Sequence, residues 1–423
     1  VVRRLTGEIT RTLAEAAADI SGSLRWSPDG KLISTGMFTP DRISAWLSLI
    51  PAEGGAARQI LKDYRGTIWG VEWTPDSRTL IAQSIEGTQA KLLSIDSSSG
   101  AVTKLGDSSV RGQNFSVSAD GRTIAYLQQP AESPGDVWVM TLGQSPRRAT
   151  NIHTQVASWR LGGMKEITWK NKKDGLTMYG VLITPPDFKA GQAYPTIVQV
   201  HGGPMGAWSS AWQGSWHDWG HFLASNGYVV FLPNPRGSTG QGWQFAEANR
   251  DDWGGMDFQD IMSGVDYLVE QRIADPNRLG IGGWSYGGFM TSWTVTQTNR
   301  FRAAVVGAAV TNLFSFNGTT DITPSFLRNY FIDLPFRRRA AYDNHSAMTF
   351  LQNCKTPSLI VHGDTDERVP VTQGWEFYNG LRMLGVPAEM VVYPREHHGI
   401  SERPHQLDLL RRVLAWYDKF LKK

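Results

Sequence analysis

The stretch with the clearest chemical potential is Gly283-Trp-Ser-Tyr-Gly287, in which a serine stands between two glycines. An apolar, strand-like segment at 279–282 precedes it, and an apolar run compatible with a helix follows it. This order predicts a strand, a very tight turn and a helix. A serine on such a turn holds its hydroxyl clear of the backbone, and a Cβ at either glycine would clash with the adjoining elements. We therefore predict that Ser285 is a nucleophile; an ordinary glycine-rich turn is the alternative.

A serine hydroxyl is a poor nucleophile at neutral pH, so Ser285 requires a base, and the base requires a group that orients it. One loop after a later predicted strand offers Asp364 and Asp366, and the loop after the next strand offers His397 and His398. We favour Asp366, which lies deeper in its loop. We favour His398 because its glycine neighbour leaves the imidazole room to face the serine. The alternative for both aspartates is a role in forming the turn.

Acyl transfer also needs fixed hydrogen-bond donors for the negative oxygen of the tetrahedral intermediate. The backbone N–H of Tyr286, directly after the serine, is one predicted donor. A second is expected from the loop in Val198-Gln-Val-His-Gly-Gly-Pro204, where Gly202 and Gly203 allow the backbone to turn an amide inward. A plain Gly-Pro turn is the alternative for this loop.

The sequence predicts neither a metal nor a cofactor. Asp257 and Asp260 stand at the start of a predicted helix, where the helix dipole favours acidic residues, so we predict that they cap this helix. His217 and His221 are spaced like ligands, but no H-E-x-x-H pattern accompanies them. Cys354 is the only cysteine, which excludes an internal disulfide and argues against a cysteine metal site.

Length and composition describe a globular protein with a sizeable core. The chain has 423 residues, enough for two or three domains, with 41% hydrophobic and 19% charged residues. A net charge of +3 is too small to indicate nucleic-acid binding. No apolar run reaches the roughly 18 residues that a membrane span needs, so we expect neither nucleic acid nor membrane as a partner. The sequence begins at Val1 rather than Met, which leaves the compartment open between the favoured cytoplasm and a secreted or periplasmic location.

The first third of the chain carries an internal repeat. Two further strand-like pieces follow each copy of a short hairpin turn, and four strands that recur every 44 to 47 residues are the signature of a β-propeller blade. We therefore predict a partial propeller of about three blades in residues 1–160. The three turns are Trp26-Ser-Pro-Asp-Gly30, Trp73-Thr-Pro-Asp-Ser77 and Val117-Ser-Ala-Asp-Gly121.

Three blades are too few for a closed ring, because propellers usually have about four to eight. The opening segment Val1–Thr6 resembles the last strand of an earlier blade. We therefore expect the sequence to be the C-terminal part of a longer protein, or the ring to be completed by another chain or subunit. A self-contained small β-domain is the alternative.

From residue 161 to 423 strands alternate with helices, which predicts a mostly parallel sheet covered on both faces. The candidate nucleophile, acid and base come in the order Ser, Asp, His, each after a strand, as is typical of the α/β-hydrolase fold. We therefore predict an α/β-hydrolase catalytic domain behind the partial propeller. The expected strands cover 167–169, 178–183, 196–200, 228–232, 279–282, 303–310, 358–362 and 388–393, and the expected helices cover 258–270, 373–384, 406–422 and the segment after Ser285.

Five motifs follow one another in the second part of the chain: His201-Gly-Gly-Pro204, Asn234-Pro-Arg-Gly-Ser-Thr-Gly240, Gly283-Trp-Ser-Tyr-Gly-Gly288, His362-Gly-Asp-Thr-Asp-Glu-Arg-Val-Pro370 and His398-Gly399. Together with the Trp-Ser-Pro-Asp-Gly turns they resemble the prolyl oligopeptidase family of serine peptidases, and most of all its acylaminoacyl-peptidase branch. The resemblance covers essentially the whole chain. It implies that Ser285, Asp366 and His398 form a catalytic triad, and that Tyr286 and Gly203 contribute the oxyanion amides.

The same resemblance implies how substrates are selected. Arg368 matches a position that binds a substrate carbonyl in prolyl oligopeptidases. The family's propeller screens the active site so that only short peptides enter, and half a propeller leaves this filter incomplete. The dipeptidyl-peptidase branch holds a free amino terminus with a pair of glutamates, and the N-terminal part of this sequence contains no such pair.

We therefore expect a serine peptidase that hydrolyses short or N-acylated peptides through an acyl-enzyme. The same machinery also cleaves esters, so a carboxylesterase is one alternative. A dipeptidyl-peptidase-like exopeptidase is another. A non-catalytic propeller scaffold is the third, although a scaffold has no physical need for Ser285, Asp366 and His398 together.

Overall fold

The chain forms two compact units in the computed structural model, which describes residues 2–3, 9–11, 20–107, 114–322 and 325–422. Unit 1 comprises Val1–Ser158 and two short later segments, Ser209–Trp212 and Thr239–Glu247. Unit 2 comprises the remainder of the chain. Within the described ranges, no helix combines the length and the apolar character needed to cross a membrane.

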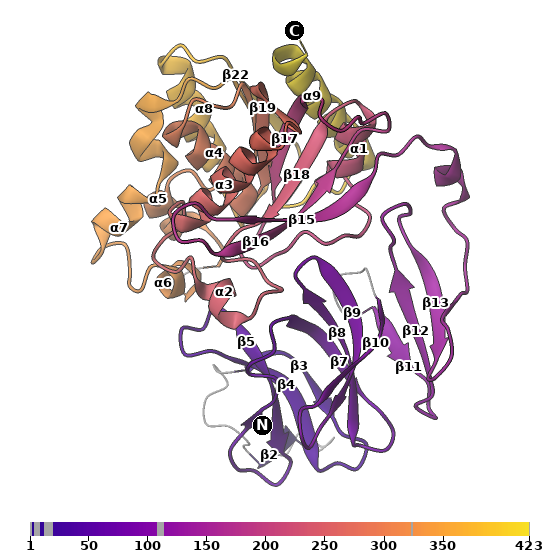
Figure 1. The fold of residues 1–423 in the computed structure, drawn as a ribbon. Helices are drawn as coiled ribbons and strands as arrows, with labels where there is room; N and C mark the ends of the chain where they lie inside the picture. Colours follow the sequence, from indigo (N-terminus) through magenta and orange to yellow (C-terminus); the bar gives the residue numbers. More distant parts are fainter. Residues whose placement is uncertain (1, 4–8, 12–19, 108–113, 323–324, 423) are drawn as a thin grey trace. The chain divides into compact units, whose positions relative to one another are not determined.

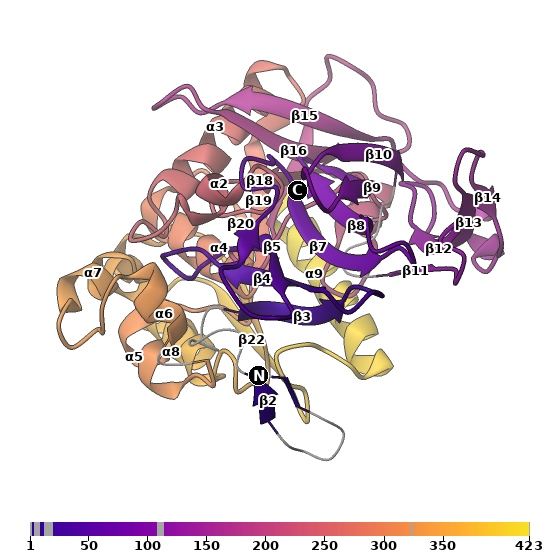
Figure 2. The same ribbon diagram turned by 90° about the horizontal axis from the view of Figure 1, so that it is seen from below.

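The described part of unit 1 contains three antiparallel sheets of four strands, which follow one another in chain order (Figures 1 and 2). The first strand of each sheet ends at one of the repeated turns, so the predicted partial propeller is confirmed. The strands are β3 (Ile20–Trp26), β4 (Leu32–Phe38), β5 (Ala45–Pro51) and β6 (Arg58–Gln59); β7 (Thr67–Trp73), β8 (Thr79–Glu86), β9 (Gln89–Asp96) and β10 (Val102–Asp107); and β11 (Phe115–Val117), β12 (Thr123–Gln128), β13 (Asp136–Thr141) and β14 (Arg147–Arg148).

The chain's first strands form a separate small sheet. β1 (Val2–Arg3) pairs with β2 (Ile9–Arg11). The other residues of the opening strand predicted at 1–6 lie outside the described ranges.

Neighbouring blades pack through buried apolar side chains. Leu80 of β8 lies in one cluster with Leu49 of the first blade, and the adjacent Ile81 lies in another cluster with Ile124 of the third. Successive side chains of a strand point to opposite faces. The middle blade therefore presents a separate set of apolar residues to each neighbour.

The two later segments of unit 1 are tied to the blades by polar contacts. Glu247, at the end of α2 (Trp243–Glu247), is buried, and its carboxylate accepts hydrogen bonds from the amide of Ser44 at 3.0 Å and from its hydroxyl at 2.8 Å. The amide of Ser210 donates to the carbonyl of Thr88 at 2.8 Å. Side chains and backbone from beyond residue 200 thus complete the interior of unit 1.

Among the described residues, unit 2 is built on one eight-stranded sheet in the order β15-β16-β18-β17-β19-β20-β21-β22 (Figure 1). β16 is antiparallel to both of its neighbours, and every pair from β18-β17 onward is parallel. All the strands predicted for this part of the sequence are present. They are β15 (Met164–Lys170), β16 (Thr177–Ile183), β17 (Tyr194–Val200), β18 (Val229–Asn234), β19 (Ala274–Trp284), β20 (Ala303–Gly307), β21 (Ser358–Gly363) and β22 (Ala388–Tyr393).

Helices cover both faces of this sheet (Figure 1). Leu223 of α1 and Tyr417 of α9 share a buried cluster with Val230 of β18 on one face. The next residue, Phe231, points to the other face and lies against Gly264 of α3. Unit 2 therefore has the predicted α/β-hydrolase architecture. Its helices are α1 (Gly220–Ser225), α3 (Met256–Glu270), α4 (Tyr286–Gln297), α5 (Leu313–Thr319), α6 (Ser325–Tyr330), α7 (Arg339–Asn344), α8 (Thr372–Met383) and α9 (Arg403–Leu421).

Candidate active site

Ser285 lies at the sharp turn between β19 and α4, as its motif predicts. Its backbone angles are φ 62° and ψ −120°, a left-handed conformation that costs a non-glycine residue on the order of 1–3 kcal/mol. The Ser285 amide donates to the carbonyl of Gly307 on β20 at 3.0 Å, and its carbonyl accepts a hydrogen bond from the Phe289 amide at 2.8 Å. The neighbouring strand and the helix thus hold the turn in place, and Ser285 itself is half-buried.

Glycines around the serine allow β17 and β20 to pass directly beside the turn. A Cβ at Gly283 would lie 2.4 Å from the carbonyl oxygen of Val200, and a Cβ at Gly287 would lie 2.1 Å from the same atom. A Cβ at Gly288 would lie 2.2 Å from the Gly307 oxygen. These distances are far below van der Waals contact, so larger side chains require the backbone to move.

Gly287→Ala is therefore expected to lower the free energy of unfolding by about 3 kcal/mol or more, because its methyl group collides with backbone rather than with a flexible side chain. Gly318→Ala in α5 is the matched control. Nothing lies within 4 Å of a Cβ at that position, and alanine favours the helix by up to about 1 kcal/mol. Chemical unfolding of both variants measures the difference, and equal stability of the two would contradict the close approach.

Ser285, His398 and Asp366 lie in one hydrogen-bonded chain. His398 Nε2 is 2.9 Å from Ser285 Oγ, and its Nδ1 is 2.8 Å from Asp366 Oδ2. A carboxylate only accepts hydrogen bonds, so Nδ1 carries the proton and Nε2 is left to accept the serine hydroxyl. The three residues follow β19, β22 and β21, at the carboxyl ends of parallel strands, as predicted from their positions in the sequence.

Asp366 is enclosed on all sides. Its side chain is 0% exposed, against 29% for His398, and its Oδ1 accepts the Val369 amide at 2.9 Å. His362 Nε2 lies 3.7 Å from the other carboxylate oxygen and donates to the Val369 carbonyl at 2.8 Å. Burial lowers the pKa of His362, so this imidazole is neutral and leaves the Asp366 charge for His398.

The residues considered as alternatives point elsewhere. Asp364 is exposed, and its amide donates to the Tyr393 carbonyl at 3.0 Å. The side chain of His397 is 68% exposed, and its Nδ1 contacts the Thr365 carbonyl at 3.1 Å. The structure thus brings Asp366 and His398, rather than their neighbours, to the serine.

The loop predicted to supply an oxyanion donor lies beside Ser285. A Cβ at Gly202 would lie 3.5 Å from the Ser285 Cβ, and Gly203 has φ 138°, which favours glycine. The His201 imidazole contacts the Gly202 carbonyl at 2.8 Å and so steadies the loop. Tyr286 is the first residue of α4, where a backbone N–H has no partner within the helix. Which amides receive the oxyanion stays a prediction for Gly203 and Tyr286.

The side chain of Tyr286 makes a contact that the sequence does not indicate. Its hydroxyl donates a short hydrogen bond to Asp257 of α3, and both side chains are buried. Burial raises the pKa of Asp257 to about 7. The other Asp257 oxygen accepts the Phe258 amide at 2.7 Å at the start of α3, which is compatible with the predicted cap. Asp257 therefore also ties the residue after Ser285 to the neighbouring helix.

The capping role predicted for Asp260 is wrong. Its buried carboxylate accepts hydrogen bonds from Arg236 Nε at 2.8 Å and Nη2 at 2.9 Å. Arg236 belongs to the loop that follows β18, and no local spacing links it with α3. The pairing of Asp260 with Arg236 depends on how α3 packs against the end of β18. The presence of acidic residues at the start of a helix does not indicate this packing.

Arg368 lies in the loop that also carries Asp366, and its guanidinium is paired. Its Nε is 2.7 Å from Asp321 Oδ1, and its Nη2 is 3.2 Å from Oδ2. Arg368 lowers the pKa of Asp321 below its ordinary value. Both side chains are nearly half exposed, at 46% and 42%. A substrate carbonyl that binds Arg368 must share it with this carboxylate.

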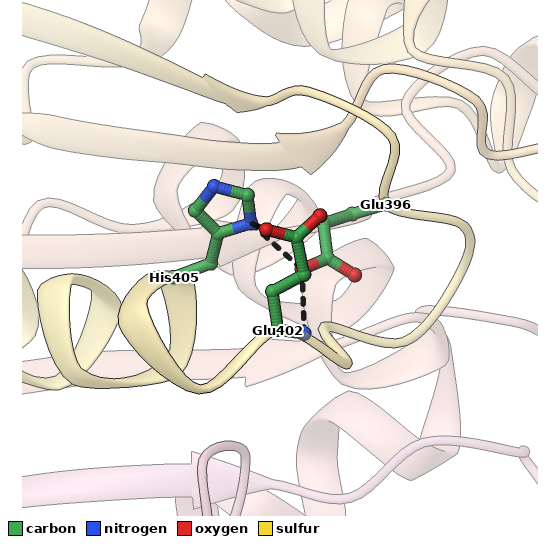
Figure 3. Close-up of side chains that lie close together, drawn as sticks. All are labelled: Glu396, Glu402 and His405. Carbon is green, nitrogen blue, oxygen red and sulfur yellow. Dashed lines mark hydrogen bonds and ion pairs between the residues drawn. The ribbon is translucent and has the colours of Figure 1, made fainter.

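One group of three potential metal ligands, Glu396, Glu402 and His405, occurs among the residues that the structure describes, with ligand atoms within 4.8 Å of one another (Figure 3). A carboxylate offers about four lone-pair positions. Four donors from the chain already occupy those of Glu396. The group therefore does not fit a metal without losing these bonds.

Residues 216–423 match the model of the prolyl oligopeptidase family. The chain belongs to this family over residues 216–423, the part that carries Ser285, Asp366 and His398. It is 33% identical over 313 residues to the uncharacterized peptidase YuxL of Bacillus subtilis, covering 73% of this chain and 47% of that protein. It is 27% identical over 435 residues to dipeptidyl-peptidase 5 of Porphyromonas gingivalis, covering 100% of this chain and 62% of that protein.

A solved structure is similar over almost the same extent. The acylaminoacyl peptidase of Pyrococcus horikoshii superposes with a TM-score of 0.81 at 25% identity, over 93% of this chain and 62% of that one. The sequence thus spans 47% to 62% of the length of these three relatives.

Proposed function

We propose that this protein is a serine peptidase that hydrolyses short or N-acylated peptides through an acyl-enzyme. The observation that carries the proposal is the chain of hydrogen bonds from Asp366 through His398 to Ser285 on a strained turn. Nucleophile, base and orienting acid in this geometry are the arrangement that activates a serine hydroxyl.

In the proposed mechanism, Ser285 Oγ attacks the substrate carbonyl while His398 Nε2 takes the hydroxyl proton. Asp366 stabilises the resulting imidazolium and keeps it oriented. The backbone amides of Tyr286 and Gly203 receive the negative oxygen of the tetrahedral intermediate. His398 then gives its proton to the leaving amine. In the second half of the reaction His398 takes a proton from water, the oxygen of that water attacks the acyl-enzyme, and His398 returns the proton to Ser285 Oγ as the carboxylic acid product leaves.

Arg368 is the proposed anchor for a substrate carbonyl. Its position after Asp366 and its half-exposed guanidinium support this role. Asp321 holds the guanidinium with two hydrogen bonds, so that the group is already oriented before a peptide arrives. A planar guanidinium has five N–H donors, which leaves donors free for the substrate.

A dipeptidyl-peptidase activity is the second candidate. It is supported by the likeness along the whole chain to dipeptidyl-peptidase 5 of Porphyromonas gingivalis. The structural similarity to an acylaminoacyl peptidase supports an acylated amino terminus instead. The two candidates differ in one chemical feature, the charge at the substrate's amino end.

The experiment compares kcat/KM on an N-acetyl-aminoacyl anilide, a free-amine dipeptidyl anilide and a short-chain aryl ester. We expect anilide turnover that stops when a fluorophosphonate is added, with one label per chain on the peptide that contains Ser285. The ratio of the acetylated to the free-amine anilide distinguishes the two candidates. Turnover of the ester alone would make the protein a carboxylesterase, and a label on another residue would overturn the assignment.

A further inference from the structure

Glu396 is a buried acidic residue two positions before the proposed base. It lies in the loop between β22 and α9, and its carboxylate points toward the first turn of α9 (Figure 3). Its side chain is 0% exposed. An uncompensated buried carboxylate would be strongly destabilising, so its partners define what it does.

The Glu396 carboxylate accepts hydrogen bonds from the far end of the same loop and from the first turn of α9. One oxygen accepts the Ser401 amide at 2.7 Å and the Ser401 hydroxyl at 2.8 Å. The other accepts the Glu402 amide at 2.9 Å and His405 Nδ1 at 2.7 Å. Burial opposes ionisation, but these donors outweigh it and lower the pKa of Glu396 to about 2. The segment 396–402, with His398 inside it, is therefore closed around one permanent negative charge.

The backbone of Glu396 joins this segment to the loop that carries the proposed acid. Its carbonyl accepts hydrogen bonds from the Thr365 amide at 3.1 Å and from the Thr365 hydroxyl at 2.9 Å. Thr365 directly precedes Asp366. A Cβ at Gly363 would lie 2.3 Å from the same carbonyl oxygen, so the two loops are in close contact. Glu396 thus fixes both the segment around His398 and its distance from the acid loop.

We propose that Glu396 is a positioning residue for the base, which holds His398 between Asp366 and Ser285 by closing its loop around a buried charge. The inference rests on the proposed function for its effect on turnover. It also predicts that Glu396 maintains the His398–Asp366 hydrogen bond, which can be tested without any substrate. Glu402, although part of the same cluster, donates to Glu396 through its backbone amide, while its side chain accepts hydrogen bonds from Arg395 and lies 3.8 Å from His405.

The decisive variant is Glu396→Gln, which preserves shape and removes the charge. A carboxamide has one acceptor oxygen, so its NH₂ group must face either the Ser401 or the Glu402 amide, donor against donor. We expect kcat to fall by about 100-fold, as for a catalytic group displaced by about 1 Å, with KM changed less than about two-fold. Glu402→Gln is the matched control: it weakens the exposed ion pair with Arg395 and a 3.8 Å contact with His405, but it leaves all four donors on the Glu396 carboxylate, so it is expected to keep the wild-type kcat.

The second readout is the low-field proton resonance of the hydrogen bond between His398 Nδ1 and Asp366, assigned by its absence in His398→Gln. We expect it to disappear in Glu396→Gln and to persist in Glu402→Gln. If Glu396→Gln does not fold, Thr365→Val removes one hydrogen bond to the Glu396 carbonyl and is expected to lower kcat several-fold. Wild-type kcat and an unchanged resonance in the variants would overturn the inference. A protein without hydrolase activity that shows the expected changes in the resonance would refute the proposed function and support the positioning role.

Discussion

Ser285→Ala is expected to lower kcat on a cleaved anilide by about 10⁶-fold, because the variant has no nucleophile for the acyl-enzyme and retains only substrate binding and oxyanion stabilisation. Among the described residues, the hydroxyl that is lost is hydrogen-bonded to His398, in a partly exposed site. Losing one such bond costs about 1 kcal/mol. The fold and the thermal unfolding midpoint should therefore stay close to those of the wild type.

Ser292→Ala is a suitable control for this experiment. Ser292 lies two helical turns further along α4, and its hydroxyl donates to the Phe289 carbonyl within the same helix at 2.8 Å. Its loss removes a hydroxyl from the same element without touching the proposed triad, so kcat should remain near the wild-type value. More than about 1% of wild-type turnover in Ser285→Ala would refute the assigned nucleophile, because a hydrolase of this type retains far less activity without its catalytic serine.

The features that sequence predicts well are those with a local physical cause. Gly283 and Gly287 are needed because β17 lies in contact with the turn. The five consecutive residues of the serine motif are enough to indicate this requirement. The turns of the blades are equally local, since a serine or threonine hydroxyl binds the aspartate two residues later in each copy. Asp366 and His398 also follow a general rule, because the ends of parallel strands meet at one edge of the sheet.

The features that sequence does not predict depend on contacts between distant parts of the chain. Asp257 meets Tyr286 across 29 residues, and Glu247 meets Ser44 across 203. No periodicity of the sequence indicates such pairs, because each pair depends on how a helix or loop packs in the folded protein. Glu396 is a third case: its carboxylate is close to its partners in sequence, but its importance follows from burial, and an isolated acidic residue in a loop is usually exposed.

Asp366→Asn tests the member of the proposed triad that forms no bond with the substrate. The carboxylate accepts the Val369 amide on one oxygen and His398 Nδ1–H on the other. A carboxamide offers one acceptor, so when its oxygen binds the amide its NH₂ faces the imidazole. His398 then takes the tautomer with the proton on Nε2, which cannot accept the proton of Ser285. We expect kcat to fall by about 10⁴-fold with a small change in KM, because binding does not involve this side chain.

Asp364→Asn is the control for the same experiment, because it makes the identical chemical change two residues earlier at an exposed position. It should keep kcat within about two-fold of the wild type, since an exposed carboxylate contributes little. If Asp364→Asn were the damaging change and Asp366→Asn the harmless one, the orienting acid would be the other aspartate. Equal, small effects of both would mean that a neutral partner orients His398 as well as a carboxylate does, and that the charge of the buried Asp366 does not stabilise the imidazolium.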